Sequence, residues 1–336
     1  MIFKWNNIDK KNEMILNLIK DTIKKNKSVL VLEPRLQNVN YMQKILDTHK
    51  GCPYIYHSKL KKTEKWDVWK NAIEGKIKII IATRHGVFLP LKNLGLIIFD
   101  DEEDDDFTSI NQKPYYDART IAELRNVEVV SFSQSPRVGT IFQELDENKI
   151  KPEITIVDLK TGDYSPISYT LKKAIRNTLQ KGKKVVLFLN RKGETGIEKL
   201  EKELRKNSPA ERIIRVDKDS NTNFEDIKKS NIIIGTEYLY KNYLYPKNQI
   251  KGIDLIVLPK ADTLFNHPDF RTDERAFAWI VKFSNLAEQE SAKFIVQTYS
   301  PENQVLRLAC QNSLDFYKRE YEIRKKFGYV RNNHTS

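Results

Sequence analysis

The strongest constraint on the fold is an alternation, repeated along the whole chain, between short apolar runs and longer amphipathic segments. Near-continuous apolar strands separated by helices are typical of parallel sheets that helices cover on both faces. The pattern therefore predicts an α/β fold. The strand-sized runs are residues 29–32, 79–81, 96–99, 127–130, 185–189, 232–234, 255–258 and 294–297, and the helical segments are 13–24, 62–73, 115–124, 168–179, 198–206 and 272–286.

The chain has 336 residues, which at roughly 150 residues per domain predicts two domains. The most polar break, residues 146–153, lies near the midpoint, so we expect one lobe over 1–150 and a second over 151–336 that ends in a basic helix. The apolar runs are too short to span a membrane. The first residues lack the features of a secretory signal, which predicts a cytoplasmic protein.

Charge and composition give two further indications. Lys and Arg number 58 against 45 Asp and Glu, a net charge of +13, which fits either a nucleic-acid partner or a solvated basic surface. There are only 12 glycines, where average usage gives roughly 24, and phosphate-binding loops depend on glycine. Cys52 and Cys310 cannot form a four-ligand zinc site, so none is expected.

One stretch carries a family resemblance. Residues 83–100 read T-R-H-G-V-F-L-P-L-K-N-L-G-L-I-I-F-D, similar to T-R-S-A-x-F-x-P-x-x-N-L-x-L-I-I-V-D of the bacterial replication-restart helicase family PriA (primosomal protein N′). The resemblance implies two RecA-like lobes, a P-loop NTPase helicase-like fold that moves along DNA. Collinear matches are H-S-x-L at 57–60, P-x-Y-x-A-R at 114–119, F-L-N-R-x-G at 188–193, G-T at 235–236, A-D, P-D-F-R and E-R within 261–275, and Q-T-Y-x-P-E at 297–302.

The family's phosphate loop, G-x-x-G-S-G-K-T, aligns with residues 5–12. The resemblance gives Lys11 the role of the lysine that reaches the β and γ phosphates, while Asn12 replaces the hydroxyl that helps to hold magnesium. Ile8 and Lys10 stand where the family has glycine, and their side chains disfavour the backbone states that a cradle needs. The favoured alternative is a polar turn before a helix, with Lys10 and Lys11 in solvent.

The family's D-E-E-H motif falls on residues 100–103, inside a run of seven acidic residues. Asp100 follows an apolar strand and is placed to bind magnesium. Asp101, with one methylene fewer than glutamate, stands at the position that orients the attacking water. The alternative, which we favour, is a solvated acidic loop.

The family's arginine-finger motif, Q-V-A-G-R-A-G-R, aligns with residues 282–289, where Leu286 and Gln289 replace both arginines. An arginine finger is worth about 10³–10⁵ in rate. Together with the altered cradle this predicts a motor that does not hydrolyse ATP, with Lys11, Asp100 and Asp101 as vestiges. No cofactor is expected, and ATP and Mg²⁺ bind only if the motor is active.

Contact with DNA does not require hydrolysis. In the family, strand-end loops hold the phosphates of one strand, and arginine side chains and backbone amides can do so without reading sequence. Residues 238–245 interleave tyrosines with Lys241; they either stack on bases or form an amphipathic turn that buries alternate tyrosines, which is favoured. The residues that the resemblance assigns to nucleic-acid contact are Arg35, Thr83, Arg84, Asn190, Arg191, Thr236 and Lys241.

The family's N-terminal DNA-binding region, its eight-cysteine zinc insert and its C-terminal domain have no counterpart in this sequence. The leading hypothesis is a degenerate PriA-like helicase core that binds DNA or replication-restart proteins without turning over ATP. A separate DNA-binding subunit is a further possible partner. The alternatives are an active ATP-dependent DNA helicase of this family and a protein-interaction scaffold without DNA contact.

Overall fold

The structure is a computed structural model that describes residues 1–49, 51–110, 113–139, 142–144, 153–161, 167–189, 196–220, 222–266 and 268–329. The chain forms two compact units, Met1–Asn148 (unit 1) and Lys149–Ser336 (unit 2). The predicted boundary at residues 146–153 lies, apart from Glu153, outside the described residues.

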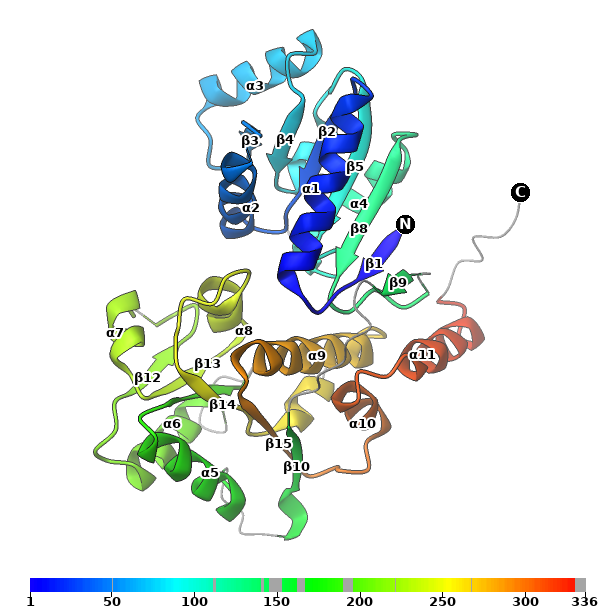
Figure 1. The fold of residues 1–336 in the computed structure, drawn as a ribbon. Helices are drawn as coiled ribbons and strands as arrows, with labels where there is room; N and C mark the ends of the chain where they lie inside the picture. The colour runs from blue at the N-terminus through cyan, green and yellow to red at the C-terminus, as the bar shows by residue number, and fades with distance from the viewer. Residues whose placement is uncertain are drawn as a thin grey trace. The chain divides into compact units, whose positions relative to one another are not determined.

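Unit 1 is built on a seven-stranded sheet in the order β3-β4-β2-β5-β8-β1-β9 (Figure 1). All of its strand pairs are parallel, as continuous apolar strands indicate. The strands are β1 (Ile2–Lys4), β2 (Ser28–Leu32), β3 (Tyr54–Tyr56), β4 (Ile79–Ala82), β5 (Leu94–Asp100), β8 (Glu128–Ser133) and β9 (Phe142–Glu144). A short antiparallel pair, β6 (Thr108–Ser109) and β7 (Tyr116–Asp117), follows β5.

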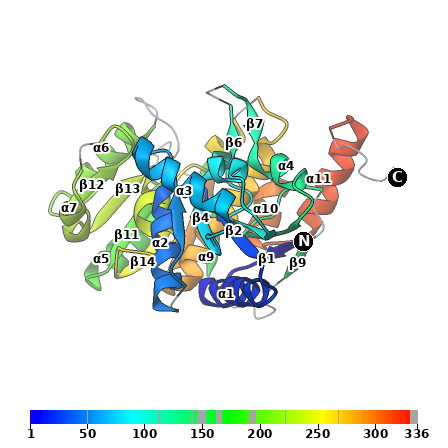
Figure 2. The same ribbon diagram turned by 90° about the horizontal axis from the view of Figure 1, so that it is seen from above.

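Helices cover both faces of this sheet. Alternate strand residues, such as Leu30 and Phe99, point toward α3 (Lys62–Glu74) and α4 (Ala118–Glu123) and form one core with them. Viewed from above, α1 (Ile8–Lys24) lies on the face opposite α4 (Figure 2). The remaining helix, α2 (Leu36–Thr48), packs against β4.

Unit 2 has a six-stranded sheet in the order β10-β15-β14-β11-β13-β12, again with every pair parallel. One face carries α5 and α6 in a shared aliphatic core; α9 packs on β14 and β15 and contacts α10, which contacts α11. The strands are β10 (Ile154–Asp158), β11 (Lys184–Phe188), β12 (Ile213–Val216), β13 (Ile232–Gly235), β14 (Ile253–Leu258) and β15 (Lys293–Thr298). The helices are α5 (Tyr169–Gln180), α6 (Ile197–Asn207), α7 (Phe224–Lys229), α8 (Glu237–Leu239), α9 (Thr272–Glu290), α10 (Gln304–Cys310) and α11 (Asp315–Lys326).

All eight strands predicted from apolar runs are present, within a few residues of the expected bounds. The predicted α/β fold with parallel sheets covered by helices is therefore confirmed. Among the described residues no helix is both long and apolar enough to cross a membrane. Because all strands of a parallel sheet end at the same edge, β1, β2 and β5 bring the residues that follow them close together.

Candidate functional site

The loop that aligns with the family's phosphate cradle is short and closes directly into a helix. Strand β1 ends at Lys4 and α1 begins at Ile8. Asn7 caps the helix, its side-chain oxygen accepting hydrogen bonds from the amides of Asp9 (3.0 Å) and Lys10 (3.1 Å). Amides at a helix N-terminus are the groups that bind phosphate in such loops. Here two of these amides, those of Asp9 and Lys10, donate to the side chain of Asn7 instead.

Lys11 lies inside unit 1, not in solvent as the favoured alternative predicted. Its side chain is 0% exposed, and its Nζ donates to both oxygens of Asp100, at 2.7 Å to Oδ1 and 2.5 Å to Oδ2. The same nitrogen lies 4.7 Å from the ring centroid of Trp5. The prediction was wrong because the first turn of α1 points this side chain toward the end of β5, where a buried carboxylate compensates its charge.

Asp100, the last residue of β5, is buried at the predicted strand end. Burial, together with the neighbouring Asp101, raises the pKa of Asp100 to about 6, although the attraction of Lys11 lowers it. Burial alone lowers the pKa of Lys11, but Asp100, Asp101 and Glu33 outweigh that effect and raise it. The contacts of the Lys11 ammonium with both oxygens of Asp100 make the two residues an internal ion pair.

Glu33 is the residue of this cluster that sequence reasoning missed. It directly follows β2, is 1% exposed, and neither carboxylate oxygen has a hydrogen-bond partner among the described residues. Burial, and then the charge of Asp100, raise its pKa well above the ordinary range. The available signal was its position, since a charged residue that ends a buried strand next to β5 falls at the same sheet edge.

The acidic run 100–106 is not a solvated loop, because four of its residues, Asp100, Asp101, Glu102 and Asp104, are buried. Asp101 has a left-handed backbone (φ 57°) and its side chain accepts a 3.3 Å hydrogen bond from Asn38. The prediction of solvation was wrong because the run turns back onto the sheet edge and is bound there by cationic side chains.

Three arginines bind this acidic run. Arg35 pairs with Asp104 and, at 3.4 Å, with Asp106, and these neighbours raise its pKa despite burial. Arg84 donates to the backbone carbonyl of Asp106 at 3.0 Å. Arg119 donates to the carbonyls of Glu102 and Asp104. Arg35 and Arg84, both predicted phosphate contacts, thus already have internal anionic or carbonyl partners.

The other predicted residues of unit 1 lie nearby. Asn12 is buried and donates to the hydroxyl of Tyr41 at 3.0 Å. Thr83 precedes a 3₁₀ turn (Arg84–Phe88), and its amide donates to the carbonyl of Tyr56 at 3.1 Å.

In this arrangement Asn7, Lys11 and Asp100 are not free to bind a nucleotide together with magnesium. Lys11 donates to both oxygens of Asp100, so a metal ion at Asp100 has to displace the ammonium group. Asn7 occupies the amides that a phosphate needs. Within the described residues no group of three or more His, Cys, Asp and Glu is arranged to hold a metal ion.

In unit 2, Thr236 caps α8 and Lys241 pairs with Glu237 at 3.4 Å. Lys241 also lies 5.8 Å from the ring centroid of Trp279. Two further predicted contacts, Asn190 and Arg191, lie outside the described residues. At the positions of the finger arginines, Leu286 is buried in α9 and Gln289 is exposed near its end.

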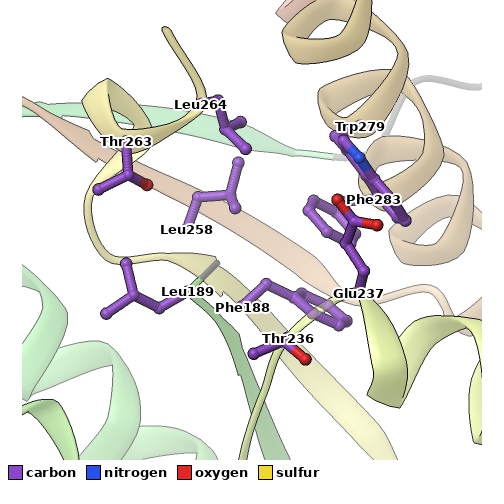
Figure 3. Close-up of a pocket in the computed structure, with 9 residues that line it drawn as sticks. All are labelled: Phe188, Leu189, Thr236, Glu237, Leu258, Thr263, Leu264, Trp279 and Phe283. Carbon is purple, nitrogen blue, oxygen red and sulfur yellow. The ribbon is translucent and has the colours of Figure 1, made fainter. Parts of the chain in front are cut away.

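The carboxyl ends of β11, β13 and β14 meet a small apolar pocket against α9 (Figure 3). Phe283 of α9 stacks on Phe188 with ring centroids 4.0 Å apart, and Trp279 lies 5.4 Å from Phe283. The free space is about 10 Å³, which suits a single water. The residues that line the pocket are Phe188, Leu189, Thr236, Glu237, Leu258, Thr263, Leu264, Trp279 and Phe283.

The chain is similar to known proteins over most of its length. No family model matches the chain. Curated proteins named replication restart protein PriA are similar to it: from Thermotoga maritima (27% identity, 95% of this chain, 54% of that protein), Bacillus subtilis (24%, 95%, 50%) and Rickettsia felis (26%, 94%, 62%). The chain thus spans about half the length of the first two relatives.

Solved structures give the same fold. The helicase MrfA bound to DNA and AMPPNP superposes with a TM-score of 0.56 at 10% identity, over 95% of this chain and 48% of that one. RecG bound to a three-way DNA junction superposes with a TM-score of 0.52 at 12% identity, over 92% and 40%. The resemblance read from the motifs is confirmed: over nearly its whole length the chain is similar to PriA replication restart proteins, and it has the α/β fold of RecA-like helicases.

Proposed function

We propose that this chain is a PriA-like helicase core that binds DNA in replication restart and whose ATP motor is inactive. The observation that carries the proposal is the Lys11–Asp100 ion pair, in which the two residues that serve phosphate and magnesium in the resemblance satisfy each other. Positioning and charge stabilisation supply nearly all phosphoryl-transfer catalysis, and both are altered here.

A DNA partner is supported by the names of the relatives and by the DNA present in the MrfA and RecG structures. The net charge of +13 has the right sign. Arg35 and Arg84 hold the acidic run and Lys241 pairs with Glu237, so a DNA phosphate has to compete with these internal partners in both units. Replication-restart proteins, or a separate DNA-binding subunit, are the proposed protein partners, in a cytoplasmic setting.

The active ATP-dependent helicase remains a second candidate, because Lys11 and Asp100 do meet at the strand ends. Purified chain is assayed for ATP hydrolysis with and without single-stranded DNA, beside Lys11→Ala. We expect no turnover that depends on Lys11. DNA-stimulated hydrolysis that Lys11→Ala abolishes contradicts the inactive motor.

DNA binding is measured on the same preparation by fluorescence anisotropy across a salt series. We expect binding of labelled single-stranded DNA that weakens steeply with salt, because phosphate contacts release counterions. Absence of binding at low salt contradicts DNA contact and favours a protein-interaction scaffold.

A further inference from the structure

A π-helical turn sorts the tyrosines of residues 238–245 onto two sides of one segment. The turn spans Tyr240–Leu244, with the amide of Tyr245 donating to the carbonyl of Tyr240 at 2.9 Å. In such a turn residues five apart lie on the same side. Tyr240 and Tyr245 are buried and stacked, with centroids 5.7 Å apart, so the amphipathic interpretation holds for this pair.

The other pair, Tyr238 and Tyr243, lies on the outer side with ring centroids 6.4 Å apart. Phe224, at the start of α7, stacks on Tyr243 at 5.8 Å with the rings 11° from parallel. We call Phe224, Tyr238 and Tyr243 the aromatic triad. Tyr238 is 37% exposed and the other two are half-buried. Three rings, from α7, α8 and the π-helical turn, therefore lie together at the surface, with Tyr238 the most exposed of them.

Core packing does not account for this surface. The buried pair, with Trp279 and Phe283, already completes the core beneath the turn. No hydrogen bond of the Tyr238 or Tyr243 hydroxyl joins the triad to any described residue. Exposed clusters of large apolar side chains mark interaction sites, and π-helical turns occur often at functional sites.

The two lysines nearest the triad already pair with acidic side chains. Lys228 lies 4.4 Å above the Phe224 ring, but its ammonium pairs with Glu225 at 2.9 Å. Lys241 pairs with Glu237. Because Lys228 and Tyr243 already lie against the Phe224 ring, Phe224 supports Tyr243, and Tyr238 and Tyr243 are the rings left for a ligand. Unpaired bases stack on such rings regardless of sequence.

We propose that the aromatic triad stacks the bases of single-stranded DNA. The proposal rests on the DNA binding proposed above and adds the class of contact. Duplex DNA is excluded as the ligand because its bases already stack on one another. The triad lies beside Thr236, whose hydroxyl oxygen accepts from the amide of Tyr238, so a strand that contacts Thr236 brings its bases within reach.

The test uses the full chain and two labelled probes of equal length, oligo(dT) and an abasic oligonucleotide with the same phosphate backbone. We expect wild-type chain to bind oligo(dT) about tenfold or more tightly than the abasic probe. In the double variant Tyr238→Ala/Tyr243→Ala we expect this difference to disappear, with the salt dependence unchanged.

Two matched variants separate stacking from other effects. Tyr238→Phe/Tyr243→Phe keeps the rings, so it retains the preference for oligo(dT). Tyr169→Ala removes a tyrosine of α5 that is 81% exposed and leaves the preference unchanged. Circular dichroism of each variant confirms an intact fold.

Equal affinity of wild-type chain for both probes overturns this inference and leaves the DNA-binding proposal standing, and so does an unchanged preference in the double alanine variant. Absence of binding to either probe removes the DNA-binding proposal and this inference together.

Discussion

The two units fill the carboxyl ends of their parallel strands by opposite means. In unit 1 that edge holds buried titratable groups, Lys11, Glu33 and Asp100, which act on one another. In unit 2 the same edge is closed by stacked rings, Phe188 and Phe283. A buried charge site depends on each partner being present, whereas an aromatic site depends on filled volume. The difference teaches that the same edge of a parallel sheet can be filled by paired charges or by packed rings.

The largest effect is expected at the Lys11–Asp100 ion pair, which lies at the sheet edge of unit 1. Asp100→Ala leaves the ammonium of Lys11 buried without its carboxylate, so we expect a loss of about 3–5 kcal/mol in the free energy of unfolding. Chemical denaturation followed by circular dichroism measures it. Replacing both partners, Lys11→Met with Asp100→Leu, is expected to restore most of the loss.

The matched surface control is Asp21→Ala, which breaks an exposed pair with Lys24 and is expected to leave stability unchanged. A loss below about 1 kcal/mol for Asp100→Ala contradicts a buried, internally paired site in unit 1.

The stacked rings at the sheet edge of unit 2 are tested by shortening one of their side chains. Phe283→Ala deletes a buried ring that contacts Phe188, Trp279 and Tyr240. We expect a loss of about 3 kcal/mol, because the surrounding rings collapse only in part into the cavity. Thermal and chemical unfolding measure it, with Phe283→Leu as the graded control. An effect near zero indicates that the edge of unit 2 is open to solvent.

A smaller effect is expected in how the stability of the chain depends on pH, because the sheet edge of unit 1 holds a buried glutamate, Glu33. The raised pKa of Glu33 means that folded protein keeps a proton that the unfolded chain releases. Stability therefore falls as pH rises from the ordinary glutamate pKa toward the raised value, by up to about 1.4 kcal/mol per pH unit, and levels off above it. Unfolding free energies at pH 5–8 compare wild-type chain with Glu33→Gln, whose side chain stays neutral.

We expect the wild-type chain to lose stability relative to Glu33→Gln across this range. Asp100, with its pKa of about 6, adds a slope of the same sign below pH 6 in both proteins, so the comparison cancels most of it. Parallel curves contradict a buried, unpaired Glu33.

The sequence was sufficient for the parts of the fold that local pattern decides. Long apolar runs such as β5 and β14 were found because a buried parallel strand is apolar throughout. Strands β1 and β3 were missed because each has only three residues, too few to show a period. Helix α2 was missed too, although its buried residues follow helical spacing.

The site could be predicted only in part, because its contacts are long-range. The resemblance brought Lys11 and Asp100 to one place, but their direct ion pair joins residues 89 positions apart. Arg35 was assigned to phosphate, and its pairing with Asp104, 69 positions away, has no local signal. The sorting of the tyrosines also needed the structure, since a π-helical turn changes which residues share a side.

The most direct measurement is calorimetric titration of the purified chain with ATP and Mg²⁺, beside Lys11→Ala. We expect no saturable binding at millimolar nucleotide, because Asn7 and the Lys11–Asp100 pair already use the groups that phosphate and magnesium need. Stoichiometric binding that Lys11→Ala removes contradicts a site filled by its own charges.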